Sequence, residues 1–183
     1  MKKVLVPLAD GFEEIETVTI IDILRRAGVE VTVAGIKPGT LAGSRNIKLV
    51  PDTTLDKVQD QEFDAVVLPG GQPGVNNLRK DSRVLEVVRR FYEKKKLVGA
   101  ICAAPLVLRD AGLIKGVKLT SYPGVASELT NSKYETTRVV IDGNFITSRA
   151  PGTALEFSLK LVELLIGKNK AEEVSEMVLA KKS

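Results

Sequence analysis

The sequence predicts a three-layer α/β domain with a mostly parallel sheet, and two features of the chain predict it. Short apolar runs alternate with segments whose apolar residues recur with the period of a helix. Within the short runs the apolar residues are continuous, as is typical of strands buried on both faces of a parallel sheet. The length of 183 residues favours a single domain over residues 1–183, without a linker or an internal repeat.

Four of the short runs are expected to form parallel strands: residues 4–8, 29–35, 65–68 and 97–101. Two further runs, residues 139–141 and 145–147, flank the segment Asp142-Gly143-Asn144. An Asp-Gly pair between two such runs is typical of a β-hairpin. The chain is therefore expected to combine parallel strands with one hairpin.

The first helix is expected to begin near a capping box formed by Asp10 and Glu13 and to end at Gly28. Its apolar stripe consists of Ile15, Val18, Ile21 and Leu24. A second helix is expected after Asp81-Ser82, with a stripe of Val84, Val87, Val88 and Phe91.

Two more helices are expected near the C-terminus. Thr153 and Glu156 match another capping box, which would open a helix through Leu165 that Gly167 can close. A last helix is expected over residues 171–179.

The chain contains no histidine and one cysteine, Cys102. Without histidine it has no Ser-His-Asp triad, no Cys-His dyad and no histidine-ligated zinc site. One cysteine forms neither an intramolecular disulfide nor a thiolate metal cluster, which fits a reducing, cytoplasmic setting. No metal site is expected, and any catalysis must use Cys102, a carboxylate, Lys, Tyr, Ser or Thr.

The net charge of +4, from 27 basic and 23 acidic residues, is too small to indicate a nucleic-acid partner. The basic run Lys94-Lys95-Lys96 follows an expected helix, where cations complement the helix dipole and face solvent. The apolar start meets Pro7 and Asp10 too early for a signal peptide, and no apolar run reaches the length of a membrane span. We therefore expect neither a membrane nor a specific nucleic-acid partner.

Cys102 directly follows the strand expected at residues 97–101, and Pro105 fits the first turn of a helix after it. In a parallel sheet, sites lie beyond the carboxyl ends of the strands. A thiol at such a turn faces free backbone N–H groups and the positive end of a helix dipole, which favour the reactive thiolate. The alternative is a buried, inert cysteine that packs as a small apolar residue.

Two other expected strands also end in segments of interest. Gly70 and Gly71 follow residues 65–68, and their backbone N–H groups could face an oxyanion, although a plain tight turn explains them equally well. Glu13, Glu14 and Glu16 follow residues 4–8, where a helix start favours acidic residues for dipole reasons alone. One of the three could instead face the strand ends, where a carboxyl kept protonated by burial would donate to the sulfur and move protons.

Four motifs together resemble the ThiJ/PfpI superfamily, and in particular its parkinsonism-associated DJ-type deglycase branch and the bacterial relatives of that branch. These motifs are residues 11–18, 68–71, 100–105 and 147–153. The resemblance covers essentially the whole chain, with the motifs in order and at similar spacings. It implies a flavodoxin-like fold, a homodimer and a cysteine on a nucleophile elbow.

The resemblance also assigns roles to individual residues. It places the nucleophile on Cys102, the protonated glutamate on Glu16, and the oxyanion donors on the backbone of Gly71 and Ala103. It places near the pocket the residues Gly70, Ser148 and Pro151, together with Arg45, which would reach the site of the dimer mate. Many members carry a histidine where this chain has Tyr122, so the proton shuttle would depend on Glu16. The alternative for Tyr122 is a packed aromatic with its hydroxyl at the pocket rim.

The activities attached to this branch require no cofactor. One is a glyoxalase reaction that converts methylglyoxal to lactate, and another is the repair of early glycation adducts. Two further attributes are oxidation of the cysteine to sulfinic acid as a stress signal and a chaperone role. The resemblance therefore implies a cysteine-dependent enzyme for small aldehydes or glycated substrates, or alternatively a non-enzymatic redox sensor and stress chaperone. A third possibility from the residues alone is a module that binds a phosphate or nucleotide at Gly70-Gly71.

Overall fold

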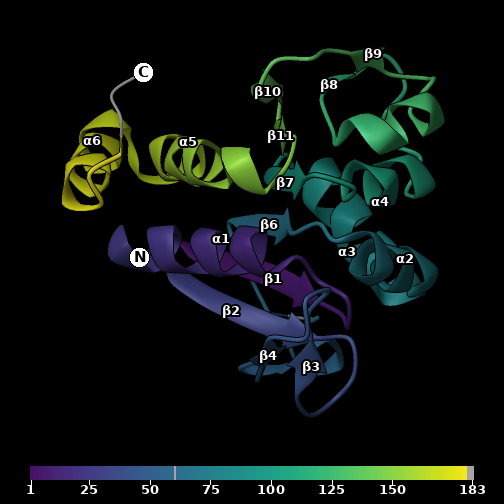
Figure 1. Ribbon diagram of the computed structural model, residues 1–183, viewed down its shortest axis with the longest axis horizontal. Coiled ribbons are helices and arrows are strands. Elements are labelled where there is room, and N and C mark those ends of the chain that lie inside the picture. Colours follow the sequence, from purple (N-terminus) through teal and green to yellow (C-terminus); the bar gives the residue numbers. More distant parts are fainter. Residues whose placement is uncertain (60, 181–183) are drawn as a thin grey trace.

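The computed structural model describes residues 1–59 and 61–180. Its centre is a seven-stranded sheet in the order β10-β11-β7-β6-β1-β2-β5 within the described residues (Figure 1). The strands of this sheet are β1 (Lys3–Leu8), β2 (Glu30–Gly35), β5 (Thr53–Thr54), β6 (Ala65–Leu68), β7 (Leu97–Ile101), β10 (Val139–Asp142) and β11 (Phe145–Ser148). Every pair is parallel except β10–β11, which is the hairpin predicted at Asp142-Gly143-Asn144. The predicted α/β class with a mostly parallel sheet is therefore confirmed.

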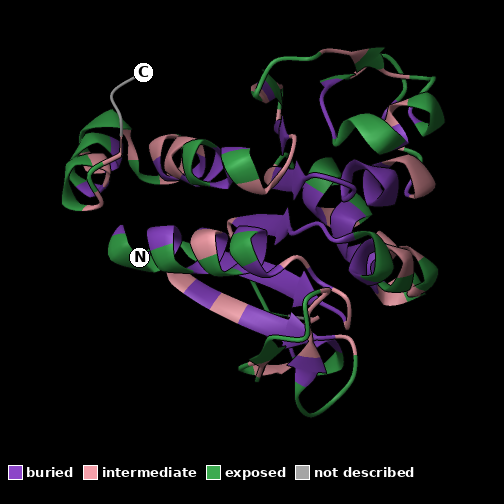
Figure 2. Cartoon of the chain, viewed as in Figure 1, coloured by how far each residue is buried: buried purple, intermediate pink, exposed green. Residues whose placement is uncertain are grey.

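The central strands are buried on both faces, as their continuous apolar runs predict. All four residues of β6 are buried, and in β1 only the first residue is exposed (Figure 2). Because successive side chains of a strand point to opposite faces, both faces of the sheet must be covered by helices. Strands with this pattern place their carboxyl ends, at Leu8, Leu68, Ile101 and Ser148, along one edge of the sheet.

The helices form two groups. The first contains α1 (Glu14–Arg26), α5 (Ala154–Ile166) and α6 (Lys168–Met177), with α1 packed on α5 and α5 on α6. The second contains α2 (Gln72–Lys80), α3 (Ser82–Glu93) and α4 (Pro105–Asp110), which contact one another. Figure 1 shows the first group on the left of the view and the second on the right. No helix within the described residues is long and apolar enough to cross a membrane.

Short elements complete the chain. Two small ribbons are formed by β3 (Leu41–Ala42) with β4 (Lys48–Leu49) and by β8 (Lys118–Leu119) with β9 (Lys133–Tyr134). Three 3₁₀ segments are η1 (Leu55–Lys57), η2 (Pro123–Glu128) and η3 (Pro151–Thr153). These pieces, and helix α2, were not predicted from the sequence. The elements of two or three residues are too short to carry a periodicity.

The predicted apolar stripe of the first helix is wrong in its first half. Ile21 and Leu24 are buried, but Ile15 is 59% exposed and Val18 is 52% exposed. Their neighbours Glu14, Glu16 and Thr17 are buried instead, because the first turn of α1 faces the polar ends of the strands rather than the apolar core. Two large apolar side chains are thereby left on the surface of α1.

Both predicted capping boxes are also wrong. The N-cap of α1 is Glu13, whose carboxylate accepts from the backbone N–H of Glu16 at 2.7 Å, while Asp10 accepts from the N–H of Ala42 at 3.0 Å. Thr153 makes no side-chain cap to α5, because its hydroxyl is bound to Ser148 and to the backbone at Ala150. The last helix runs over Lys168–Met177, a few residues earlier than predicted.

Candidate functional site

Cys102 lies in the turn between β7 and α4 and has a φ angle of 63°. This left-handed conformation is uncommon for a residue other than glycine and persists only where the surrounding structure holds it. Two backbone bonds do so here. The N–H of Cys102 donates to the carbonyl of Ser148 at 3.0 Å, and its carbonyl accepts from the N–H of Tyr122 at 2.8 Å. The turn that carries the thiol is therefore fixed to the end of β11 and to the segment before η2.

The backbone N–H and the carbonyl of Gly70, which lies just beyond β6, both form hydrogen bonds with the start of α1. Its N–H donates to Oε2 of Glu16 at 2.8 Å, and its carbonyl accepts from the N–H of Glu13 at 2.9 Å. A Cβ atom at this position would lie 2.5 Å from both the Cβ of Cys102 and Oε2 of Glu16. Only glycine fits, because the carboxyl and the cysteine approach Gly70 from both sides.

The three glutamates at the start of α1 have three different surroundings. Glu13 caps the helix, and Glu14 accepts from the hydroxyl of Ser44 at 3.1 Å and from the N–H of Arg45. Glu16 points to the strand ends and is completely buried. The sequence alone did not distinguish among them, whereas the resemblance assigned the site residue to Glu16, which is the one that the structure places beside Cys102.

Burial, followed by the charge of Glu13, raises the pKa of Glu16 to about 8. The bond from Gly70 and the contact with the Cys102 thiol act in the opposite direction but are weaker. Oε1 of Glu16 is buried and has no hydrogen-bond partner of normal geometry among the described residues. At neutral pH Glu16 is therefore a carboxylic acid, with an oxygen able to carry a proton toward the sulfur.

Burial also raises the pKa of the Cys102 thiol, to about 12, and a negative charge on Glu16 is the second cause. The backbone N–H groups of Gly71 and Ala103 bond to the sulfur and act in the opposite direction. The amides therefore act in the expected direction, and burial acts as the alternative of a buried cysteine implies. The amides are present, but burial outweighs them, and α4 is only six residues long.

The two groups titrate as a pair. Loss of the first proton from Glu16 leaves a thiol beside a carboxylate, which is the arrangement that raises the pKa of Cys102. Loss of the first proton from the sulfur leaves a thiolate beside a carboxylic acid, whose O–H can donate to it. The protonation of Glu16 thus decides how easily Cys102 becomes a nucleophile.

Gly71 and Ala103 supply N–H groups from two different elements. Gly71 is the N-cap of α2 with a φ of 91°, and a Cβ there would lie 2.5 Å from the N of Glu13 and the O of Gly11. Glycine is therefore required both by conformation and by space. Ala103 follows Cys102 in the turn. The predicted cluster of Cys102, Glu16, Gly70, Gly71 and Ala103 is brought together.

Of the other predicted site residues, Ser148 and Tyr122 form backbone hydrogen bonds with Cys102. Ser148 contributes its carbonyl, but its hydroxyl donates to the carbonyl of Arg138 and contacts Thr153. Tyr122 contributes its backbone N–H, while its side chain is 48% exposed and its hydroxyl bonds to no described residue. Pro151 begins η3 and lies inside the turn that the hydrogen bonds between Thr153 and Ala150 close. Arg45 is exposed and does not reach the cysteine of its own chain.

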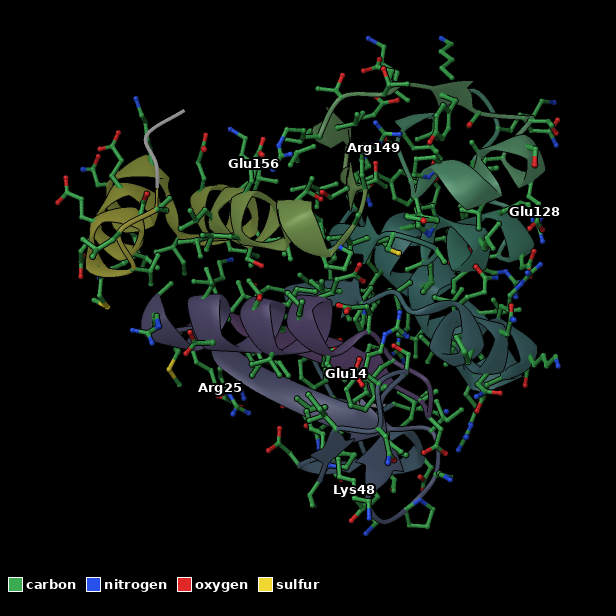
Figure 3. All side chains as sticks on the ribbon, viewed as in Figure 1. Glu14, Arg25, Lys48, Glu128, Arg149 and Glu156 are labelled. Carbon is green, nitrogen blue, oxygen red and sulfur yellow. The ribbon has the colours of Figure 1, made fainter. Side chains whose placement is uncertain are left out.

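One residue near the site, Arg149, was not identified as a candidate from the sequence, and the role of another, Glu14, was left open. Arg149 donates from Nε to the carbonyl of Ser121 at 3.3 Å and from Nη1 to that of Thr136 at 2.9 Å, and so ties the segment before Tyr122 to β11. Glu14 holds the Ser44-Arg45 loop (Figure 3). Arg149 lies within a motif of the resemblance, which could have indicated it, but the partners of Glu14 are about thirty residues away and left no pattern.

A groove of about 390 Å³ lies elsewhere, between α1, α5 and α6. None of the predicted site residues lines it, and its walls come from Val18, Thr19, Asp22, Ile23, Arg26, Leu155, Met177 and Val178. Cys102 itself is only 9% exposed. Unless the surrounding turns move, only small molecules can therefore reach the thiol.

The fold and this site define a class of α/β protein in which a buried cysteine–glutamate pair lies at the carboxyl edge of a parallel sheet. Residues 2–164 match the model of the DJ-1/PfpI family, and the chain belongs to that family.

Several relatives match the chain over nearly their whole length. The chain is 47% identical to the protein dj-1beta of Drosophila melanogaster over 181 residues, which is 97% of each chain. It is 36% identical over 165 residues to Deglycase PH1704 of Pyrococcus horikoshii, covering 89% of this chain and 99% of the relative. The crystal structure of Drosophila DJ-1beta superposes with a TM-score of 0.97 over 99% of both chains. The structure of oxidized DJ-1 from Toxoplasma gondii superposes with a TM-score of 0.95 over 100% of both chains, and the two sequences are 35% identical.

Proposed function

We propose that this protein is a cofactor-independent enzyme that uses Cys102 to attack small reactive carbonyl compounds. Its reaction would be the conversion of methylglyoxal to lactate, the repair of early glycation adducts, or both. The observation that carries the proposal is the placement of a protonatable, fully buried carboxyl beside the one thiol of the chain. The name of the Pyrococcus relative, a deglycase, supports the same class of substrate.

In the first step the Cys102 thiolate adds to the aldehyde carbon of methylglyoxal and forms a carbon–sulfur bond. The carbonyl oxygen becomes an oxyanion, for which the N–H groups of Gly71 and Ala103 are the donors. Glu16, as a carboxylic acid, gives its proton to that oxygen and becomes a carboxylate. The product of the step is a neutral hemithioacetal on Cys102.

In the second step the Glu16 carboxylate removes the proton from the former aldehyde carbon, and the electron pair passes to the neighbouring carbonyl oxygen to give an enediolate. Glu16 then returns the proton to the neighbouring carbon. The hydroxyl proton on the first carbon passes to the adjacent oxyanion, which leaves a thioester of lactate on Cys102. Water hydrolyses this thioester, lactate leaves, and Cys102 is regenerated. The sum of the steps is methylglyoxal plus water giving lactate and a proton, so the reaction needs no external oxidant or reductant.

The test is lactate release from methylglyoxal by the wild type, Cys102→Ser and Glu16→Gln. We expect no lactate from Cys102→Ser. Glu16→Gln should be slower by at least about 100-fold, because a positioned acid–base group contributes roughly 10²–10⁴-fold. Equal rates from all three proteins would contradict the mechanism. A second series with glycated peptide in place of methylglyoxal separates the glyoxalase from the deglycase reaction.

The alternative function is a redox sensor, with a stress-chaperone role attached to the oxidised form. Two molecules of hydrogen peroxide would oxidise the thiolate to a sulfinate and be reduced to water. The amides of Gly71 and Ala103, which bond to the sulfur, could equally hold a sulfinate oxygen. The Toxoplasma relative is described as an oxidized DJ-1, which supports this possibility for that protein. Uptake of two oxygen atoms on Cys102 in graded peroxide, seen by intact mass, would support sensing, and no uptake would contradict it.

We also propose that the protein works as a homodimer. The exposed apolar side chains Ile15 and Val18 lie one turn apart on α1, and Val18 borders the groove between α1, α5 and α6. Exposed apolar residues of this kind typically mark a protein interface. Arg45 lies on a loop that the buried Glu14 holds against the start of α1, so the partner copy could receive it near its own site.

A further inference from the structure

Four charged side chains from α2, α4 and η2 form an ion-pair cluster: Arg79, Arg109, Asp110 and Glu128. Arg79 donates from Nε to Oδ2 of Asp110 at 2.5 Å and from Nη2 to Oδ1 at 3.3 Å. Arg109 donates from Nε to Oδ1 of Asp110 at 2.8 Å and from Nη1 to Oε2 of Glu128 at 2.7 Å. Asp110 is thus the shared acceptor of two guanidinium groups.

The cluster joins the far ends of three segments that each begin at the site. Gly71 caps α2, which ends with Arg79 and Lys80. Cys102 precedes α4 by a short turn, and α4 ends at Asp110. Tyr122 precedes η2, which ends at Glu128 (Figure 3). Gly71, Cys102 and Tyr122 are therefore each followed by a segment whose other end carries Asp110 or is bound to it, directly or through Arg109.

Three side chains of this cluster are less exposed to solvent than those of ordinary surface ion pairs. The side chains of Arg79, Arg109 and Asp110 are only 20–25% exposed, whereas most other ion pairs among the described residues join more exposed groups. Burial acts to raise the pKa of Asp110, but the hydrogen bonds from Arg79 and Arg109 outweigh it and hold the pKa below its usual range. A forked pair that is partly buried and shared among several groups restrains geometry more than an isolated exposed pair does.

We infer that this cluster is a positioning device for the thiol site, with Asp110 as its central residue. The inference rests on the proposed function only in that it takes Cys102 as the reactive group. None of the four residues contacts the sulfur, so they act through the segments that carry them. With Asp110 in place, α2 and α4 keep the N–H groups of Gly71 and Ala103 directed at the sulfur. Without it, the two short elements shift relative to each other and the donors lose their geometry.

The test is the pH dependence of Cys102 alkylation by iodoacetamide in the wild type and in Asp110→Asn. Loss of a negative charge alone would favour the thiolate and move the midpoint to lower pH. Loss of positioning would weaken the amide donors, move the midpoint to higher pH and slow alkylation at pH 7. We expect the second result, with a rate about threefold to tenfold lower, since small misplacements of reacting groups cost factors of this order or more.

Asp64→Asn is the matched control. Asp64 pairs with Lys2 and accepts from the N–H of Lys3, at the amino end of β6 and so at the edge of the sheet opposite the site. We expect this variant to keep the wild-type alkylation profile. A midpoint in Asp110→Asn that falls, or that equals the midpoint of Asp64→Asn, would overturn the inference.

A second variant covers the case in which Asp110→Asn does not fold. Arg79→Lys keeps the positive charge but loses the forked geometry, and we expect it to move the midpoint in the same upward direction by a smaller amount. An unchanged profile in folded Arg79→Lys would then overturn the inference. Lactate release by the wild type is measured separately. An upward shift in a chain that releases no lactate would support the positioning cluster and contradict the proposed enzyme.

Discussion

The backbone N–H of Gly70 donates to Oε2 of Glu16 at 2.8 Å, although the two residues are 54 positions apart in the chain. This bond occupies one oxygen of the carboxyl and leaves the other, Oε1, buried without a hydrogen-bond partner among the described residues. The carboxyl also contacts the thiol of Cys102. Since Gly70 lies at the end of β6 and Glu16 in the first turn of α1, the geometry of the pair depends on how the helix start meets the sheet edge. A change that moves either residue should therefore change the reactivity of the thiol.

Gly70→Ala should separate the cysteine from the glutamate. The new Cβ would lie 2.5 Å from the Cβ of Cys102 and from Oε2 of Glu16, so one of them must move. We expect slower alkylation of Cys102 and a loss of roughly 1–3 kcal/mol in the free energy of unfolding, as is usual for overpacking. Denaturant unfolding and alkylation rates measure the two effects. Gly152→Ala, where a Cβ meets no atom within 4 Å, is the control and should change neither.

Tyr122→Phe should leave the alkylation profile of Cys102 unchanged. The tyrosine side chain is 48% exposed and its hydroxyl bonds to no described residue, while the bond to Cys102 comes from the backbone.

Tyr122→His introduces the residue type that the family resemblance leads one to expect at this position. We predict faster lactate release from this variant, because an imidazole is a better base than a phenol at neutral pH. Stopped-time assays of lactate release by the wild type and both variants measure these effects. Slower lactate release by Tyr122→Phe would show that the hydroxyl takes part in the reaction.

Val18→Glu should convert a dimer to a monomer. Val18 is 52% exposed on α1 and borders the groove between α1, α5 and α6, so a charge there would be buried in the proposed interface. Sedimentation velocity of the wild type and the variant measures the change. Ile141→Glu, on the edge strand β10, introduces the same charge at another exposed apolar side chain and should leave the mass unchanged. A wild type that sediments as a monomer would contradict the proposed dimer.

Glu14→Gln should destabilise the protein at neutral pH and much less in acid. Burial acts to raise the pKa of Glu14, but bonds from the N–H of Arg45 and the hydroxyl of Ser44 outweigh it and lower the pKa. A lowered folded-state pKa gives stability that is present above the unfolded-state pKa and is lost as the pH falls through the folded-state value. The difference in unfolding free energy should therefore be about 1.5–3 kcal/mol at pH 7 and shrink below about pH 4. A difference that is constant with pH would indicate that the charge of Glu14 has no role.

The fold was largely predictable because its central strands are apolar on both faces and its helices carry clear periodicity. Residues 65–68 and 97–101 became β6 and β7 with the predicted bounds. The surface of α1 was not predictable in the same way. Periodicity identifies an amphipathic helix, but Ile15 and Val18 are as apolar as Ile21, and only the tertiary arrangement decides which of them is buried.

The site was predictable to a smaller extent. The strand ends located Cys102, Gly70 and Gly71, but they did not separate Glu16 from Glu13 and Glu14, because all three fit a helix start equally well. The sequence also left open whether Cys102 is an activated or a buried thiol, since burial depends on packing that composition does not contain.

The central claim is that neutral Glu16 supports the Cys102 thiolate, and the pH dependence of Cys102 alkylation in the wild type and in Glu16→Gln tests it most directly. Cys102→Ser serves as the blank for labelling at other groups. The account predicts slower alkylation at pH 7 and a higher midpoint in Glu16→Gln, because an amide N–H is a weaker donor to sulfur than a carboxylic O–H. If Glu16 acted only as a negative charge, removing it would lower the midpoint, and that result would contradict the account.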